Sequence, residues 1–175
     1  MLELTVQKKR RKWPQEGEIF TVKLSRSEEE LTFYGKVLAV NVDPWFMRLD
    51  RNPESDLLIV AVYQQGCTPE DGPNRQLFRP QIINRLGWTT GYFLTVDTKL
   101  VSAEEHESTR YWSDGLSPET FYKIDWTTHE VEKIQEPNSQ WIGQLSLGNH
   151  LTLGQWIAES LGDELKLPGK AVDWS

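Results

Sequence analysis

The chain has 175 residues, of which 38% are hydrophobic, and it carries a net charge of −7. This length is enough for one domain with a substantial core, and the single cysteine, Cys67, excludes an intrachain disulfide framework and favours a reducing, cytoplasmic location. No apolar run is long enough to cross a bilayer, and the basic N-terminus lacks the apolar stretch of a signal peptide.

Charge is spread unevenly along the chain. Residues 1–12 hold five basic side chains and one acidic side chain, so they carry +4 and the other residues carry −11. An acidic body argues against nucleic acid as a partner and attracts basic partners. We interpret residues 1–16 as a solvated, frayed basic arm, residues 17–162 as a single globular domain, and residues 163–175 as an extended tail.

The residue pattern of the first half of the domain predicts β-strands. Apolar and polar residues alternate over 18–24 and 32–42, which predicts two half-buried antiparallel strands joined by a charged loop over 25–30. Residues 57–63 are nearly all apolar and rich in β-branched side chains. This run is too short for a typical helix and predicts a central strand that is buried on both faces.

The second half mixes strands with short helical signals. A strand is predicted over 88–97, and Ser102 begins a capping-box pattern that predicts a helical turn. Residues 121–126 and 130–134 flank a short polar segment, which predicts a β-hairpin. Residues 140–147 alternate and predict a last strand.

The clearest helix is predicted to begin at the N-cap Thr152 and to stop at Gly162. Four apolar residues fall on one face of it: Leu153, Trp156, Ile157 and Leu161. The expected fold is therefore α+β and β-rich, with a strongly bent antiparallel sheet, or a partial SH3-like barrel, flanked by a C-terminal helix.

No pattern in the chain carries a specific chemistry. The histidines, His106, His129 and His150, lack the spacing that places two metal ligands on one helix face, and one cysteine cannot build a thiolate cage. No nucleophile elbow and no phosphate-binding glycine loop is present. We therefore predict no catalytic residues, no metal and no cofactor. An alternative is a small hydrolase whose cleft combines acidic residues with one of the histidines.

The order of short motifs resembles the bacterial immunity protein 26 family, whose members are found beside polymorphic toxins. A basic lead-in is followed by Gly17-Glu18-Ile19-Phe20, then by Tyr34-Gly35-Lys36-Val37 and by an apolar strand that ends at Tyr63. A Gly87-Trp88-x-x-Gly91 segment, a hairpin at 118–134 and a helix around Trp156 complete the order. The resemblance implies a cytoplasmic, non-enzymatic antitoxin that binds and neutralises a cognate protein toxin, and it implies no catalytic residues.

A toxin that is a nuclease would have a basic active cleft, which an acidic inhibitor complements. Exposed tryptophans among the eight in the chain would add desolvated anchors. The residues that we predict to face the partner lie in loops expected to be exposed: Glu28, Glu29, Glu30, Trp45, Glu104, Glu105, Trp112 and Asp114. The alternative partner is nucleic acid, bound by the basic arm, and no membrane partner is expected.

Overall fold

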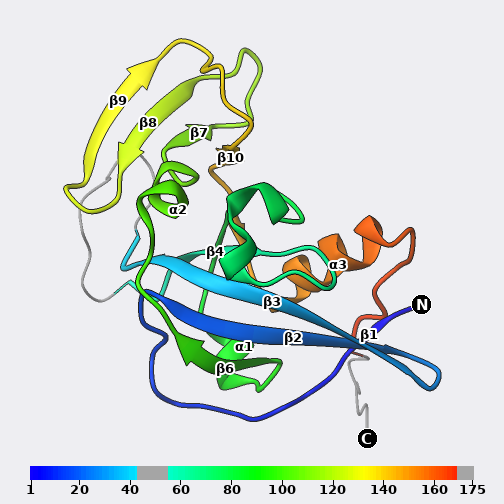
Figure 1. The fold of residues 1–175 in the computed structure, drawn as a ribbon. Coiled ribbons are helices and arrows are strands. Elements are labelled where there is room, and N and C mark those ends of the chain that lie inside the picture. Colours follow the sequence, from blue (N-terminus) through cyan, green and yellow to red (C-terminus); the bar gives the residue numbers. More distant parts are fainter. Residues whose placement is uncertain (43–54, 169–175) are drawn as a thin grey trace, which may run out of the picture.

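The computed structural model describes residues 1–42 and 55–168 as two β-sheets with a C-terminal helix (Figure 1). The larger sheet has seven strands in the order β1-β2-β3-β4-β5-β11, and β6 also pairs with β2. It curls into a half-barrel, which confirms the predicted α+β class, the strongly bent sheet and the C-terminal helix. Its strands are β1 (Glu3–Leu4), β2 (Glu18–Arg26), β3 (Glu29–Val40), β4 (Leu58–Val62), β5 (Gln81–Ile83), β6 (Phe93–Thr98) and β11 (Leu147–Gly148).

The smaller sheet stands apart from the half-barrel as a separate lobe (Figure 1). Its order is β10-β7-β8-β9, with β10 (Ile142–Gln144), β7 (Tyr111–Ser113), β8 (Phe121–Asp125) and β9 (Glu130–Ile134). The predicted hairpin over 121–134 is confirmed as β8 and β9. The α-helices are α1 (Leu86–Thr89), α2 (Ala103–Glu107) and α3 (His150–Ser160), and two short 3-10 helices span Pro69–Asp71 and Pro73–Arg75.

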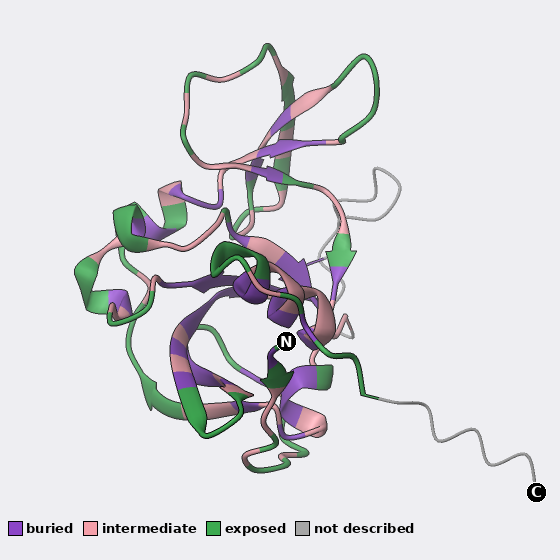
Figure 2. Ribbon diagram, turned by 90° about the vertical axis from the view of Figure 1, so that its right-hand side faces the viewer, coloured by how far each residue is buried: buried purple, intermediate pink, exposed green. Residues whose placement is uncertain are grey.

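Strand β4 is buried on both faces, as its apolar run predicts, because it lies between two hydrophobic cores. Figure 2 shows buried segments gathered in the interior of the molecule and exposed segments in its outer loops. Leu58, Val60 and Val62 point into the half-barrel, where α3 packs. The intervening residues, together with Tyr63, belong to a second core that the half-barrel shares with the small sheet. Because successive side chains of a strand point to opposite faces, β4 contributes to both cores and connects the half-barrel to the small sheet.

The β2–β3 hairpin has a tighter turn than the sequence indicated, and the predicted loop over 25–30 is wrong. Strand pairing continues to the pair Arg26 and Glu29, so only Ser27 and Glu28 form the turn. Ser27 adopts a positive φ of 54°, the left-handed backbone that two-residue hairpin turns require. Glycine and asparagine usually mark such a turn, and neither is present in this segment.

The N-terminal segment is not frayed, which corrects the expectation for residues 1–16. Leu2 is fully buried, and β1 pairs with β2. Farther along, the Arg10 guanidinium forms a charge-assisted pair with Glu18 and donates a second bond to Thr95 (3.1 Å). These contacts hold the segment against the half-barrel.

Three other element boundaries differ from the predictions. Trp88 lies in α1, so the strand predicted over 88–97 begins only at Phe93. The strand predicted over 140–147 is divided between β10 and β11, which belong to different sheets. Asn149, rather than Thr152, caps α3, and its side chain accepts bonds from the Leu151 and Thr152 amides (2.8 and 3.1 Å).

The tail predicted over 163–175 begins inside the fold. Leu165 is buried and forms a β-bridge with Leu2, and the Lys166 ammonium pairs with Glu3 at 2.7 Å. Residues 169–175, which include Trp174, lie outside the described residues.

A tight aromatic contact fixes the centre of the half-barrel. Phe20 packs against Trp88 (ring centroids 4.9 Å) and Phe93 (5.0 Å), and its ring lies over Gly35 on the neighbouring strand. A methyl group at position 35 would overlap this ring. We predict that Gly35→Ala lowers the free energy of unfolding by about 1–3 kcal/mol through overpacking, measured by urea denaturation.

The control is Gly66→Ala, where an added methyl group meets no atom within 4 Å and only the positive φ of 80° opposes it. A cost at position 66 equal to or above that at position 35 would contradict the role assigned to the Phe20 contact.

The ion pair that anchors the N-terminal segment is expected to depend on pH. Burial alone would raise the pKa of Glu18, but bonds from Arg10, the Gln15 amide and Thr95 outweigh it and lower that pKa. The stability that Glu18 contributes is therefore full above its ordinary pKa of about 4.3 and is lost as the pH falls through the lower folded value. We expect the wild-type urea midpoint to exceed that of Glu18→Gln most at pH 6–7, and the gap to close below pH 4.

The exposed Glu119→Gln variant is the control for this titration, since no ion pair joins Glu119 to another described residue. A gap between wild type and Glu18→Gln that stays constant from pH 7 to pH 3 would show that the Glu18 charge does not anchor the segment.

Candidate partner-binding site

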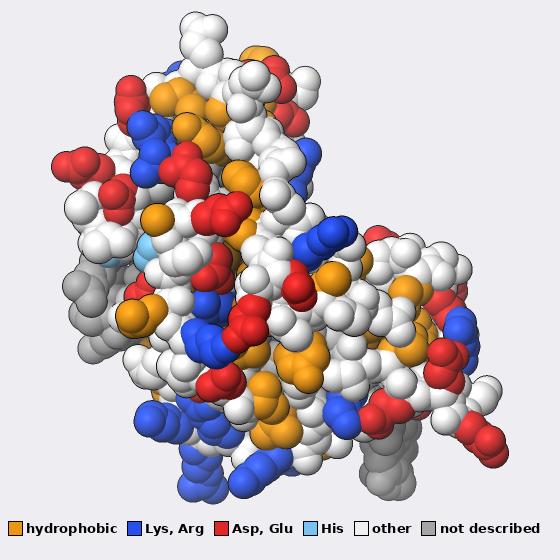
Figure 3. Space-filling model, viewed as in Figure 1, with side chains coloured by type: hydrophobic (Ala, Val, Ile, Leu, Met, Phe, Trp, Pro, Cys, Tyr) orange, Lys and Arg blue, Asp and Glu red, His pale blue; other side chains and the backbone are white. Residues whose placement is uncertain are grey.

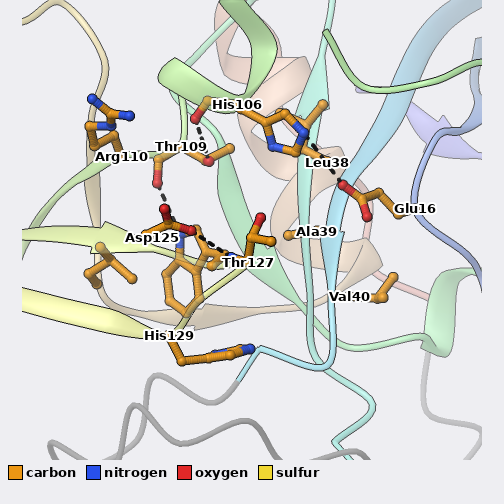
Figure 4. Close-up of a pocket in the computed structure, with 12 residues that line it drawn as sticks. Glu16, Leu38, Ala39, Val40, His106, Thr109, Arg110, Asp125, Thr127 and His129 are labelled. Atoms are coloured by element: carbon orange, nitrogen blue, oxygen red, sulfur yellow. Dashed lines mark hydrogen bonds and ion pairs between the residues drawn. The ribbon is translucent and has the colours of Figure 1, made fainter. Parts of the chain in front are cut away.

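A cleft of about 330 Å³ lies between the half-barrel and the small sheet (Figure 4). Strand β3 forms one wall, the β8–β9 hairpin forms the other, and α2 with the residues after it covers one end. The lining is mostly polar. It consists of Glu16, Leu38, Ala39, Val40, His106, Thr109, Arg110, Ile124, Asp125, Trp126, Thr127 and His129.

Helix α2 is positioned by a capping box and a buried ion pair. Ser102 accepts a bond from the Glu105 amide (3.1 Å), and the Glu105 carboxylate accepts one from the Ser102 amide (2.9 Å). The same carboxylate oxygen pairs with the Lys36 ammonium at 2.9 Å, and both side chains are almost fully buried. Lys36 also donates to the Leu100 carbonyl (3.0 Å). This pair therefore connects β3 of the half-barrel to the segment that leads into the small sheet.

Tyr63 and Gln76 extend the polar environment of this ion pair. The Tyr63 hydroxyl, Gln76 Oε1 and Glu105 Oε2 are buried and lack a hydrogen bond of normal geometry to any described residue. Burial raises the pKa of Tyr63, and the nearby charge of Glu105 raises it further, so the phenol stays protonated. A neutral hydroxyl near a carboxylate is a potential hydrogen-bond donor to it.

Two tryptophans support the floor of the cleft. Trp112 and Trp126 pack edge to face with ring centroids 5.8 Å apart. Both indole N–H groups donate to the Thr109 carbonyl, at 2.7 Å and 2.9 Å. Trp112 is buried, whereas Trp126 is partly exposed and lines the cleft. A partner side chain in the cleft would therefore meet an aromatic surface as well as polar groups.

The charged and titratable groups of the cleft come from three segments of the chain. Figure 4 shows Glu16 and Asp125 on opposite sides, with His106 close to Glu16. The His106 Nε2 and Glu16 Oε1 atoms are 3.8 Å apart. Bonds from the Thr128 and Thr127 amides lower the pKa of Asp125, so this carboxylate stays ionised and holds the turn between β8 and β9.

His129 ends this turn with a positive φ of 61° and completes the cleft lining. The third histidine, His150, lies elsewhere, in α3, where it stacks on Tyr92 (ring centroids 5.0 Å). Burial lowers the pKa of His150. The structure thus places two of the three histidines in the lining of one cleft.

Among residues 1–42 and 55–168, no group of three or more histidine, cysteine or acidic side chains is arranged to hold a metal ion. In the same part of the chain, no helix combines the length and the apolar character that crossing a membrane demands.

The residues predicted to face a partner do not form one surface. Glu28, Glu29 and Glu30 lie exposed at the tip of the β2–β3 hairpin, far from the small sheet (Figure 1). Glu104 is exposed on α2, and Asp114 is partly exposed in the loop after β7. Trp45 lies outside the described residues.

Two of these predictions are corrected by burial. Glu105 has 5% of its surface exposed and pairs with Lys36, and Trp112 has 1% exposed and packs in the second core. Neither side chain is available to a partner at the surface. The sequence did not single out the cleft residues Glu16 and Arg110, and the histidines His106 and His129 were the one signal that pointed toward the cleft.

Acidic side chains are concentrated in residues 102–144, which comprise α2 and the small sheet and are named the acidic lobe here. This segment holds nine acidic and three basic side chains, a net charge of −6, whereas residues 1–101 carry a net charge of +1. Only Glu105 and Glu107 of the nine form an ion pair with a described residue. Figure 3 shows acidic groups, with some basic groups among them, over the upper lobe, and basic groups gathered along the lower edge.

In comparisons with known proteins, no family model, no curated protein and no solved structure matched the chain.

The Lys36–Glu105 pair generates a prediction about stability. Removing one member leaves the other charge buried without a partner, so Lys36→Met and Glu105→Gln are each expected to lower the free energy of unfolding by about 3–5 kcal/mol. The double variant loses far less than the sum, because no unpaired charge remains. Urea denaturation of the four proteins completes the double-mutant cycle, and additive losses would show that the two charges do not depend on each other.

Proposed function

We propose that this protein is a non-enzymatic immunity protein that binds and neutralises a cognate bacterial protein toxin through its acidic lobe. The observation that carries the proposal is the concentration of charge: −6 of the total −7 lies in residues 102–144, in side chains that are mostly exposed. A lobe in which acidic side chains predominate, beside a polar cleft, is suited to a basic protein surface.

Charge complementarity increases the association rate and the specificity for the partner. Opposite charges steer two proteins together and raise the association rate above the value for neutral surfaces. Proteins with an acidic surface are repelled by the lobe, which adds specificity. Exposed carboxylates contribute little to affinity one by one, so tight binding needs desolvated anchors as well. The cleft supplies such a position, since Trp126 and the ionised Asp125 lie side by side in its lining.

The sequence resemblance to the immunity protein 26 family supports the same proposal, because the motif order implies a toxin-binding protein. The residues that carry the resemblance lie in the structural core. Phe20, Gly35 and Trp88 meet in the half-barrel core, and Tyr63 lies beside the Lys36–Glu105 pair. On this proposal, the scaffold presents the acidic lobe and takes no direct part in contact with the toxin.

A second candidate, a small hydrolase, is favoured by one observation: His106 and His129 line the same cleft as Glu16 and Asp125. A histidine and a carboxylate within reach of one ligand are the parts that acid–base catalysis needs. The variant His106→Ala, His129→Ala separates the two candidates. It abolishes hydrolysis if the cleft is catalytic, whereas a wild-type protein that rescues growth without hydrolysing any substrate favours the binding surface.

The proposal predicts that co-expression with the toxin encoded beside this protein restores growth and yields a stable complex. The triple variant Glu130→Lys, Glu132→Lys, Glu136→Lys reverses exposed charges of the lobe. We expect it to slow association with the toxin at least tenfold at low salt and to lose the rescue of growth. The association rate is measured by stopped-flow or surface-based kinetics.

The matched control reverses three exposed acids at the tip of the β2–β3 hairpin, in the variant Glu28→Lys, Glu29→Lys, Glu30→Lys. Two of these acids form exposed ion pairs with Arg26 and Lys23, which contribute about 0–1 kcal/mol each. Rescue by this control but not by the lobe variant supports the lobe as the binding surface. Absence of rescue by the wild type would overturn the proposed function, and loss of rescue by the control alone would overturn its location.

A further inference from the structure

The basic N-terminal segment is held in place on the outside of the half-barrel. The Gln7 and Lys8 amides donate to the Gly91 carbonyl (2.7 and 3.2 Å), and the Arg10 amide donates to the Trp88 carbonyl (3.0 Å). Gly91 has a positive φ of 89°, and a methyl group there would lie 3.0 Å from the Lys9 amide nitrogen. The close approach of the segment to the loop before β6 therefore depends on this glycine.

The five basic residues of the segment have two different roles. Arg10 points inward, where it bonds Glu18, Thr95 and the Trp13 carbonyl. The other four are exposed, and no ion pair joins them to any residue that the structure describes. These four, named the basic strip here, are Lys8, Lys9, Arg11 and Lys12. Their backbone is fixed by the bonds of Gln7, Lys8 and Arg10, so their charges project from a preorganised scaffold.

An aromatic residue with a stacked guanidinium ends the strip. Trp13 is half-buried, and the Arg85 guanidinium lies over its ring at 4.2 Å from the centroid. A row of cations that leads to an aromatic ring and an arginine plane is the combination by which proteins bind single-stranded nucleic acid: the cations contact phosphates, and the planar groups stack with bases. We propose that the basic strip, with Trp13 and Arg85, is a binding site for single-stranded nucleic acid.

The acidic lobe does not oppose this binding at physiological salt. Figure 1 places the N-terminal segment along the lower edge of the half-barrel and the small sheet at the opposite end, and Figure 3 shows basic groups gathered at the lower edge. Charges separated by more than a Debye length, about 8 Å at physiological ionic strength, interact weakly through solvent. The electrostatic potential at the basic strip is therefore determined by nearby charges and not by the overall charge of −7.

This site is independent of the proposed toxin-binding function, because it uses none of the residues of the acidic lobe. The test measures binding of the full-length protein to fluorescein-labelled dT20 and U20 by fluorescence anisotropy, from 25 to 300 mM salt. The decisive variant replaces Lys8, Lys9, Arg11 and Lys12 with glutamine and leaves Arg10 intact. The matched control replaces Lys23, Arg75, Lys133 and Lys166 with glutamine, which removes the same charge elsewhere.

We expect the wild type and the control to bind both oligonucleotides. The strip variant is expected to bind them at least tenfold more weakly than the wild type at 50 mM salt. The slope of log K against log salt for the wild type is expected near −3, since single strands give about −0.7 for each of four phosphate contacts. Trp13→Leu weakens binding to dT20 but not to a polyphosphate of equal charge, because only bases stack.

Three results would overturn the site: no binding of either oligonucleotide at 25 mM salt, equal loss of affinity in the strip variant and the control, or binding to phosphatidylserine vesicles without binding to oligonucleotides.

Discussion

The placement of the acidic lobe depends on the buried ion pair between Lys36 and Glu105. Lys36 lies on β3, in the wall of the half-barrel, and Glu105 lies on α2, where the chain leaves the half-barrel for the small sheet. A buried charge is tolerated only when it is paired and hydrogen-bonded, so this pair specifies one position for α2. The cleft between the two sheets follows from that position, because α2 supplies His106 and is followed by Thr109 and Arg110.

The distribution of charge follows the division of the molecule into a half-barrel and a small sheet. The half-barrel with its N-terminal segment is almost neutral overall and carries an ordered basic strip, whereas the lobe holds nearly all of the net negative charge. Strand β4 contributes to the cores of both parts, so the two charged regions are built on one continuous hydrophobic framework. The two proposed binding surfaces therefore share a scaffold and differ in sign of charge and in partner.

The sequence predicted the elements whose signal is local. The apolar run of β4, the capping box at Ser102 and the β8–β9 hairpin were found because each depends on residues close together in the chain. Glu105 was misplaced at the surface because its partner, Lys36, lies 69 residues away. The cleft was missed for the same reason, since its lining comes from four distant segments. The N-terminal segment carries a weak local signal of order that the prediction did not use, because Leu2 and Leu4 alternate with polar residues and pack against the core.

We propose that the acidic lobe contacts a protein toxin while the half-barrel serves as its scaffold. Hydrogen–deuterium exchange of the protein alone and in complex with the proposed cognate toxin tests this proposal directly, because backbone amides at a contact surface exchange more slowly in the complex. The account predicts new protection in α2 and in strands β8 and β9, with unchanged exchange at the tip of the β2–β3 hairpin and in α3. Protection confined to the hairpin tip or to α3, with an unprotected lobe, would contradict it.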